Sequence, residues 1–162
     1  MQYRRFEDLP VWRDSAELAR SMYEFTALDC FRPHAGLRDQ LERAALSVSN
    51  NIAEGFERGT TNELLAFLYI ARGSAGEVRS MMRVLQTWDI FANCKSQISN
   101  FINQCEKISK QLYGWIESLK NSEIPGQRRL DDKARNRYAN KKDREEFLAE
   151  LNRLTSRMPD KP

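Results

Sequence analysis

The sequence predicts an all-α protein: an antiparallel up-down four-helix bundle followed by a charged C-terminal extension. Apolar residues recur at spacings of three and four in four successive segments, which is typical of amphipathic helices. No segment shows the sustained alternation expected of a strand. Short loops join the four segments, and an antiparallel bundle is the most economical way to cover each apolar stripe. We therefore expect residues 1–121 to form the bundle domain and residues 122–162 the extension.

The first helix is expected to begin with Asp8 as its N-cap and Pro10 in its opening turn. Pro33 and Gly36 mark the exit from this segment. The expected core stripe consists of Trp12, Ala16, Ala19 and Tyr23. The spacings of four, three and four place these side chains on one face of a helix.

The second helix is expected from about Leu37 to Phe56, closing at Gly55 or Gly59. Its expected core stripe consists of Leu37, Leu41, Ala44, Val48 and Ile52. A regular stripe of this length predicts a helix that buries one side against its neighbours.

Thr60 and Glu63 form a capping-box pattern that predicts the start of the third helix, which continues to about Trp88. Its expected core stripe consists of Leu64, Leu68, Ala71, Ala75, Val78, Met82 and Leu85. A polar turn around Asn93–Ser96 separates it from the fourth helix. The expected stripe of that helix consists of Ile98, Ile102, Cys105, Ile108, Leu112, Trp115 or Ile116, and Leu119.

Composition indicates a folded helical protein, because 41% of the residues are hydrophobic and glycine and proline are few. The cysteines and the N-terminus lead us to expect a cytoplasmic protein. Three cysteines, Cys30, Cys94 and Cys105, are odd in number and lack metal-ligand spacing, so we expect reduced thiols. The N-terminus lacks the apolar core of a secretion signal, and no apolar run approaches the roughly 20 residues that span a bilayer. No membrane association is expected.

Positive charge is concentrated in the extension. Residues 122–162 carry 11 Lys and Arg against 8 Asp and Glu, which accounts for the whole net charge of +3. Arg128, Arg129, Arg135 and Arg137 belong to this basic stretch, which is either a nucleic-acid-binding arm or a solvated linker. Apolar residues at helical spacing follow from Phe147 to Met158, which predicts a short helix with an apolar face too small to fold alone. It would dock on the bundle, pair with a copy of itself, or bind another protein.

Small and polar residues interrupt the second and third helices at regular places. Gly73 and Gly76 lie in mid-helix, where each glycine costs about 0.5–1 kcal/mol relative to alanine, so the missing side chains must serve a contact. The residues expected to pack against a helix or a second subunit are Asn50, Asn51, Glu54, Gly73, Ser74 and Gly76. The alternatives are a phosphate or ligand contact for the glycine segment and direct recognition for the amides.

Five arginines of the bundle are candidates for phosphate contacts: Arg38, Arg43, Arg72, Arg79 and Arg83. A planar guanidinium suits bidentate contacts with phosphate. The same arginines could instead pair with local acids such as Asp39, Glu42 and Glu77. Repetition in an oligomer would let several weak patches bind one RNA together.

The residues that catalysis would need are missing from the pattern. His34 is the only histidine and sits in a corner between Pro33 and Gly36, where a surface role is expected. Cys30 lies four residues before it, with no third group to orient a nucleophile. A di-iron bundle would need Glu-x-x-His motifs, which the sequence does not contain. We therefore expect no enzymatic activity, no cofactor and no bound metal.

Four motifs carry a resemblance to a known family. They are Phe6-Glu7-Asp8-Leu9-Pro10-Val11-Trp12, Leu37-Arg38-Asp39-Gln40-Leu41-Glu42-Arg43-Ala44-Ala45, Ser49-Asn50-Asn51-Ile52-Ala53-Glu54-Gly55 and Ile70-Ala71-Arg72-Gly73-Ser74-Ala75-Gly76-Glu77. Over about residues 3–121 the chain resembles the 23S rRNA intervening-sequence proteins, a four-helix-bundle family. That family is similar in fold to the accessory variability determinant of diversity-generating retroelements, a homopentameric barrel that binds nucleic acid and a reverse transcriptase. The resemblance implies a ring-shaped homopentamer with an RNA-linked role and no known enzymatic activity.

Two functions follow from these observations. The first is an oligomeric RNA-binding or other nucleic-acid-binding accessory protein, which could assist a reverse transcriptase or be linked to an rRNA intervening sequence. The alternative is a protein-interaction scaffold that presents several copies of the C-terminal helix. Salt distinguishes them, because binding through phosphates weakens steeply as salt rises and an apolar contact hardly changes.

Overall fold

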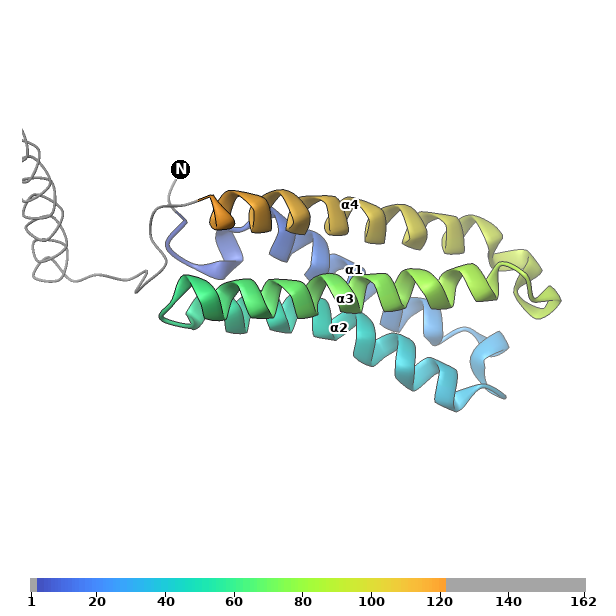
Figure 1. The fold of residues 1–162 in the computed structure, drawn as a ribbon. Helices are drawn as coiled ribbons and strands as arrows, with labels where there is room; N and C mark the ends of the chain where they lie inside the picture. Colours follow the sequence, from blue (N-terminus) through green and yellow to red (C-terminus); the bar gives the residue numbers. More distant parts are fainter. Residues whose placement is uncertain (1–2, 122–162) are drawn as a thin grey trace, which may run out of the picture. The chain divides into compact units, whose positions relative to one another are not determined.

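The computed structural model describes residues 3–121, which form four α-helices joined by short loops and 3-10 turns (Figure 1). The helices are α1 (Pro10–Thr26), α2 (Ala35–Glu57), α3 (Thr61–Leu85) and α4 (Lys95–Lys120). The 3-10 turns are η1 (Phe6–Asp8), η2 (Asp29–Phe31) and η3 (Asp89–Cys94). Residues 3–121 contain no strand, so the predicted helical bundle is confirmed. The short helix predicted in the extension lies outside the described residues.

The four helices pack as an antiparallel bundle. α2 lies between α1 and α3, and α3 lies between α2 and α4, while α1 also contacts α4 (Figure 1). The contact between α1 and α4 is the least extensive of the four. Each helix therefore covers the apolar stripe of a neighbour, as the short loops require. None of the helices in this part of the chain is both long and apolar enough to cross a membrane.

The start of α1 differs from the sequence-based expectation. Asp8 is not the N-cap: Leu9 holds that position, and no side chain caps the helix. Asp8 belongs to η1, where its Oδ1 atom lies 3.4 Å from Arg5 Nη2 and 3.8 Å from Arg13 Nη2. Pro10 is the first helical residue and has no N–H group, so this end has one donor fewer to satisfy.

The buried stripe of α1 is rotated by about one residue from the predicted one. Its buried residues are Val11, Ser15, Leu18, Ala19, Met22, Phe25 and Thr26. Trp12 and Ala16 are only partly buried, and Tyr23 is exposed. Two adjacent stripes of this helix are apolar at the same spacing, so periodicity alone cannot choose between them. Ser15 is tolerated in the core because its hydroxyl donates to the Val11 carbonyl oxygen at 2.7 Å.

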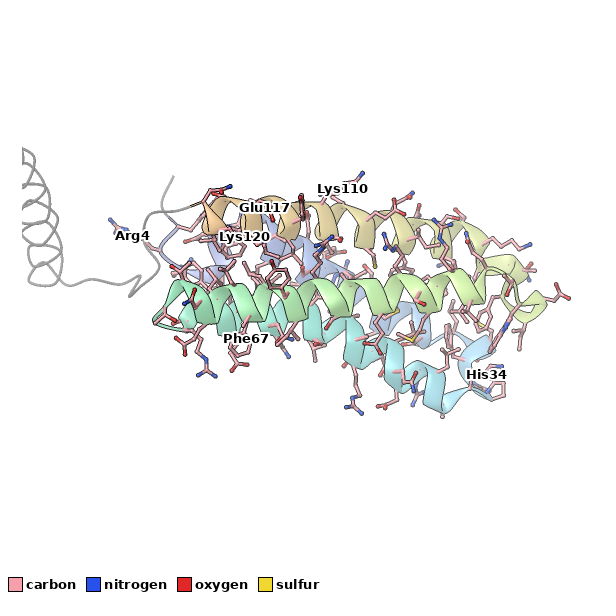
Figure 2. All side chains as sticks on the ribbon, in the orientation of Figure 1. Arg4, His34, Phe67, Lys110, Glu117 and Lys120 are labelled. Atoms are coloured by element: carbon pink, nitrogen blue, oxygen red, sulfur yellow. The ribbon has the colours of Figure 1, made fainter. Side chains whose placement is uncertain are left out.

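The loop between α2 and α3 is held by the predicted capping box, which is confirmed. Thr60 Oγ1 accepts a hydrogen bond from the Glu63 backbone N–H at 3.2 Å and donates to Glu63 Oε2 at 2.7 Å. α2 does not close at Gly55 but runs to Glu57. Gly55 instead permits close approach of α3, since a Cβ atom there would lie 2.7 Å from the Cβ atom of Phe67. Phe67 is labelled in Figure 2.

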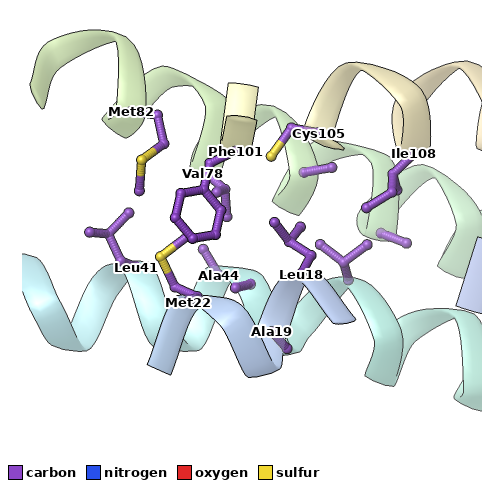
Figure 3. Close-up of a cluster of buried hydrophobic side chains, with 14 of the residues drawn as sticks. Leu18, Ala19, Met22, Leu41, Ala44, Val78, Met82, Phe101, Cys105 and Ile108 are labelled. Carbon is purple, nitrogen blue, oxygen red and sulfur yellow. The ribbon is translucent and has the colours of Figure 1, made fainter. Parts of the chain in front are cut away.

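The core runs through the middle of the bundle, with side chains from all four helices interleaved (Figure 3). On α4, Ile116 is fully buried and Trp115 is only partly buried. The core stripe, for which the sequence allowed either residue, therefore contains Ile116. α3 ends at Leu85 rather than near Trp88. The chain then enters η3, which brings Phe91 into the core.

Candidate nucleic-acid interface

The five candidate arginines of the bundle divide into two groups. Arg38 and Arg43 lie on α2, where each faces a carboxylate one helical turn away: Arg38 Nε is 3.8 Å from Glu42 Oε1, and Arg43 Nη1 is 3.7 Å from Asp39 Oδ2. Glu42 Oε1 also accepts a hydrogen bond from Thr26 Oγ1 at 2.6 Å, which joins α1 to α2. These two arginines therefore belong to local pairs on α2 rather than to a shared surface.

The other three arginines lie along the seam between α3 and α4. We call this surface the α3–α4 strip. It consists of Tyr69, Arg72, Gly76, Arg79 and Arg83 on α3, and Glu106, Ser109, Tyr113, Glu117 and Lys120 on α4. Spacings of three and four keep each set on one side of its helix, and the antiparallel packing brings the two sets together. At 1.5 Å per residue, the strip extends for about 20 Å along α3.

Arg72 is the best-oriented cation of the strip. Its Nε atom donates to Ser109 Oγ at 3.3 Å, and its guanidinium carbon lies 5.1 Å from the centre of the Tyr113 ring. Among residues 3–121, no carboxylate forms an ion pair with Arg72. The hydroxyl and the ring hold the side chain across the seam, so less rotamer freedom is lost when an anion binds. The positive charge remains available for a phosphate.

Arg79 and Arg83 share one carboxylate. Glu106 Oε1 lies 3.9 Å from Arg79 Nη1 and 3.6 Å from Arg83 Nη2. Both arginines are substantially exposed, and exposed ion pairs of this kind contribute only about 0–1 kcal/mol. A phosphate can therefore compete with Glu106 at modest cost. The pair of arginines keeps a positive excess at this end of the strip.

Lys120 and Tyr69 close the other end of the strip. Lys120 Nζ lies 2.8 Å from Glu117 Oε1, and both residues are labelled in Figure 2. The same Nζ atom lies 5.7 Å from the centre of the Tyr69 ring. The hydrogen bond to Glu117, and then the one to Tyr69, raise the pKa of Lys120. The ammonium group is therefore charged throughout the physiological range. Tyr69, Tyr113 and Lys120 were not predicted from sequence, although Tyr69 has the helical spacing to Arg72 that could have suggested it.

The glycines and Ser74 of α3 have different environments. A Cβ atom added at Gly73 or Gly76 would meet no atom within 4 Å, so neither glycine serves a close contact between helices within this bundle. Ser74 does face α2: its hydroxyl lies 2.9 Å from that of Ser47, to which Asn51 Nδ2 donates at 2.9 Å. Ser74 and Asn51 thus belong to a polar contact between α2 and α3. The cost of placing Gly73 and Gly76 in a helix would therefore be offset by contact with a second subunit or with a ligand.

Asn50 and Glu54 do not join that polar contact. Glu54 Oε1 pairs with Arg58 Nη2 at 2.6 Å on the surface of α2. Asn50 lines a hollow of about 450 Å³ between α1 and α2. Trp12 and Tyr23, predicted to be core residues, line the same hollow. The second apolar stripe of α1 therefore borders an open surface instead of the core.

Two of the three thiols are protonated at neutral pH. Burial raises the pKa of the Cys105 thiol to about 12. Burial, with the neighbouring Cys94 thiol, also raises the pKa of Cys30. Both groups are therefore protonated at neutral pH, and the thiol is a far weaker nucleophile than the thiolate. The His34 ring lies 5.7 Å from the Trp88 ring centre, packed at the end of the bundle.

The sequence also predicted that no metal is bound and that the extension contains a basic arm. Within residues 3–121, no three His, Cys, Asp or Glu side chains gather in a way that could hold a metal ion. The predicted arm containing Arg128, Arg129, Arg135 and Arg137 lies outside the described residues. The α3–α4 strip is thus the surface on which three of the five candidate arginines of the bundle lie together.

Comparison with known proteins agrees with this architecture. A solved structure from Bacteroides thetaiotaomicron, described as a protein of unknown function from the S23 ribosomal protein family, has a TM-score of 0.59 and 20% sequence identity. The match covers 66% of this chain and 98% of that one, and at this identity it supports the fold alone. No curated protein matches the sequence. The model of the 23S rRNA-intervening sequence protein family matches residues 7–114, which include most of all four helices. The chain therefore belongs to the family of 23S rRNA-intervening sequence proteins.

Proposed function

We propose that this protein is a non-enzymatic, self-associating RNA-binding accessory protein whose α3–α4 strip contacts the phosphate backbone. The proposal rests mainly on Arg72, whose side chain is oriented by Ser109 and Tyr113 and has no carboxylate partner among residues 3–121. Arg79 and Arg83, which share Glu106, and Lys120, which pairs with Glu117, add further cations to the strip. The family's description as intervening-sequence proteins of 23S rRNA supports RNA as the nucleic acid. A reverse transcriptase is a proposed protein partner.

Self-association is the second part of the proposal. Ile70, Gly73 and Val84 lie on a part of α3 that faces away from the core, and 52% of the Ile70 side chain is exposed. A bare glycine backbone one turn from the exposed Ile70 suits the close approach of a helix from another copy. A ring of five copies would repeat the α3–α4 strip and multiply weak phosphate contacts through avidity.

Light scattering on the full chain tests the assembly. We expect a mass several times the 18.9 kDa of one chain, because the apolar and glycine positions of α3 would be covered by a neighbouring copy. Dilution series would give the dissociation constant. A particle of 18.9 kDa at every working concentration would contradict the assembly and leave each strip to act alone.

Arg72→Gln is expected to weaken RNA binding about equally for different sequences and to lower the salt slope. Removing one phosphate contact should reduce the slope of log K against log salt by about 0.7 for a single strand or 0.9 for a duplex, per chain engaged. The measurement is filter binding or fluorescence anisotropy of the full chain with a labelled RNA, between about 50 and 200 mM salt.

Arg43→Gln is the matched control for that experiment. Arg43 is another mid-helix arginine, but it is exposed and lies on α2 beside Asp39 and away from the strip. Its loss should leave both affinity and slope close to those of the unaltered chain. Equal slopes for Arg72→Gln and the unaltered protein would overturn the assignment of the strip. A complex that hardly responds to salt would instead favour the scaffold function.

A further inference from the structure

We infer that the α3–α4 strip binds single-stranded RNA in preference to duplex, with one base stacked on Tyr69 and another on Tyr113. The inference rests on the proposed function and specifies its substrate: unpaired nucleotides whose bases are free to leave the helix stack. Phosphate contacts alone would carry no such preference, since both forms of RNA present a charged backbone.

The two tyrosines share a local arrangement. Each ring has a cation of the neighbouring helix over one face: Lys120 Nζ is 5.7 Å from the Tyr69 centre, and the Arg72 guanidinium carbon is 5.1 Å from the Tyr113 centre. The cations limit where each ring can move. Even so, 46% of Tyr69 and 51% of Tyr113 remain exposed, which leaves aromatic area for another flat group. Exposed tyrosines oriented in this way are suited to stacking against a base.

Arrangement along the strip adds a second argument. Tyr69 precedes Arg72 by one turn on α3, and Tyr113 and Lys120 lie two turns apart on α4, so each of two successive levels of the seam has one ring and one cation on opposite helices. Proteins that bind single strands combine a positive track for the backbone with aromatic side chains for the bases. Gly76, between Arg72 and Arg79, leaves open space above the helix in the middle of that track.

Duplex RNA fits this surface less well. In an A-form helix the base faces are covered by their neighbours, and side chains cannot enter the deep and narrow major groove. Tyr69 and Tyr113 could then contact only sugars and phosphates. A single strand can turn its bases onto the two rings while its phosphates meet Arg72 and Lys120.

The test compares one RNA sequence as a single strand and as a perfect duplex, using the full chain and fluorescence anisotropy. Tyr69→Ala and Tyr113→Ala should each weaken single-strand binding by about 5-fold or more, as expected for loss of one stacked base. Duplex binding should change much less. The salt slope should stay unchanged for both variants, because the cations remain.

Phenylalanine at either position distinguishes stacking from hydrogen bonding by the hydroxyl. Tyr69→Phe and Tyr113→Phe keep the ring and should bind the single strand as well as the unaltered protein does. A 2-aminopurine base in the single strand should lose fluorescence on binding to the unaltered chain and keep more of it with the alanine variants. Urea unfolding of each variant verifies that the fold is intact.

Tyr23→Ala is the matched control. Tyr23 has the same 46% exposure as Tyr69, but it lines the hollow between α1 and α2. Its removal should leave single-strand affinity unchanged. Unchanged affinity for Tyr69→Ala and Tyr113→Ala, or an equal loss for the duplex, would overturn the inference while Arg72-dependent RNA binding still stood. An unaltered chain that binds neither form would refute the proposed function as well.

Discussion

Phe91→Ala is expected to lower the free energy of unfolding of the bundle by about 3–5 kcal/mol, the usual cost of removing a buried aromatic side chain. Phe91 is fully buried although it lies in the short turn η3 rather than in a helix. Its ring centre lies 4.9 Å from that of Phe31 and 6.0 Å from that of Trp88. The truncation would leave a cavity where the turns η2 and η3 meet the core.

Urea unfolding followed by circular dichroism measures this effect, and Ile90→Ala provides the control. Ile90 precedes Phe91 in the same turn and is 49% exposed, so its truncation should change the free energy of unfolding by less than about 0.5 kcal/mol. Similar midpoints for the two variants would show that η3 does not anchor this end of the bundle. A clear separation would show that a residue outside the four helices is part of their core.

Gly55→Ala is expected to destabilise the bundle by about 1–3 kcal/mol, although alanine is the better helix former. The added Cβ atom would lie 2.7 Å from Phe67 Cβ and 3.1 Å from Leu64 Cδ1. Phe67 Cβ is attached directly to the backbone of α3, so the clash can be relieved only by moving that helix away from α2. The measurement is again the urea midpoint.

Gly73→Ala and Gly76→Ala should have the opposite effect on the isolated bundle. An added Cβ atom meets nothing within 4 Å at either position, so each change should raise the free energy of unfolding by about 0.5–1 kcal/mol. If a neighbouring copy packs on Gly73, the same substitution should also lower the mass seen by light scattering. Equal stabilities for the Gly55→Ala and Gly73→Ala variants would contradict the close contact between α2 and α3.

The candidate interface could be predicted only in part. The spacing of Arg72, Arg79 and Arg83 is enough to place them on one side of a helix. Their partners come from α4, and Ser109 follows Arg72 by 37 residues in the chain. Tyr113 was missed for the same reason, because nothing in its local pattern indicates that Arg72 will lie beside it.

Features that depend on residues close together in the sequence were predicted most reliably. The Thr60 and Glu63 pattern predicted the start of α3, because a capping box involves only residues within one turn. Asp8 does not cap α1, because its carboxylate pairs with Arg5 and with Arg13 of α1 instead. A side-chain N-cap can be predicted from sequence when no other hydrogen-bond donor competes for the side-chain oxygen.

By itself, the sequence determined that this protein forms four amphipathic helices, roughly where each of them begins, and which arginines share a helix face. Tertiary structure alone decided which of two apolar stripes on α1 enters the core, which glycine is crowded, and which of the five candidate arginines has no carboxylate partner among residues 3–121. Helical periodicity and capping depend on residues within a few positions of one another. Burial and ion pairing depend on side chains that packing brings together from distant parts of the chain, as at Gly55 and Arg72.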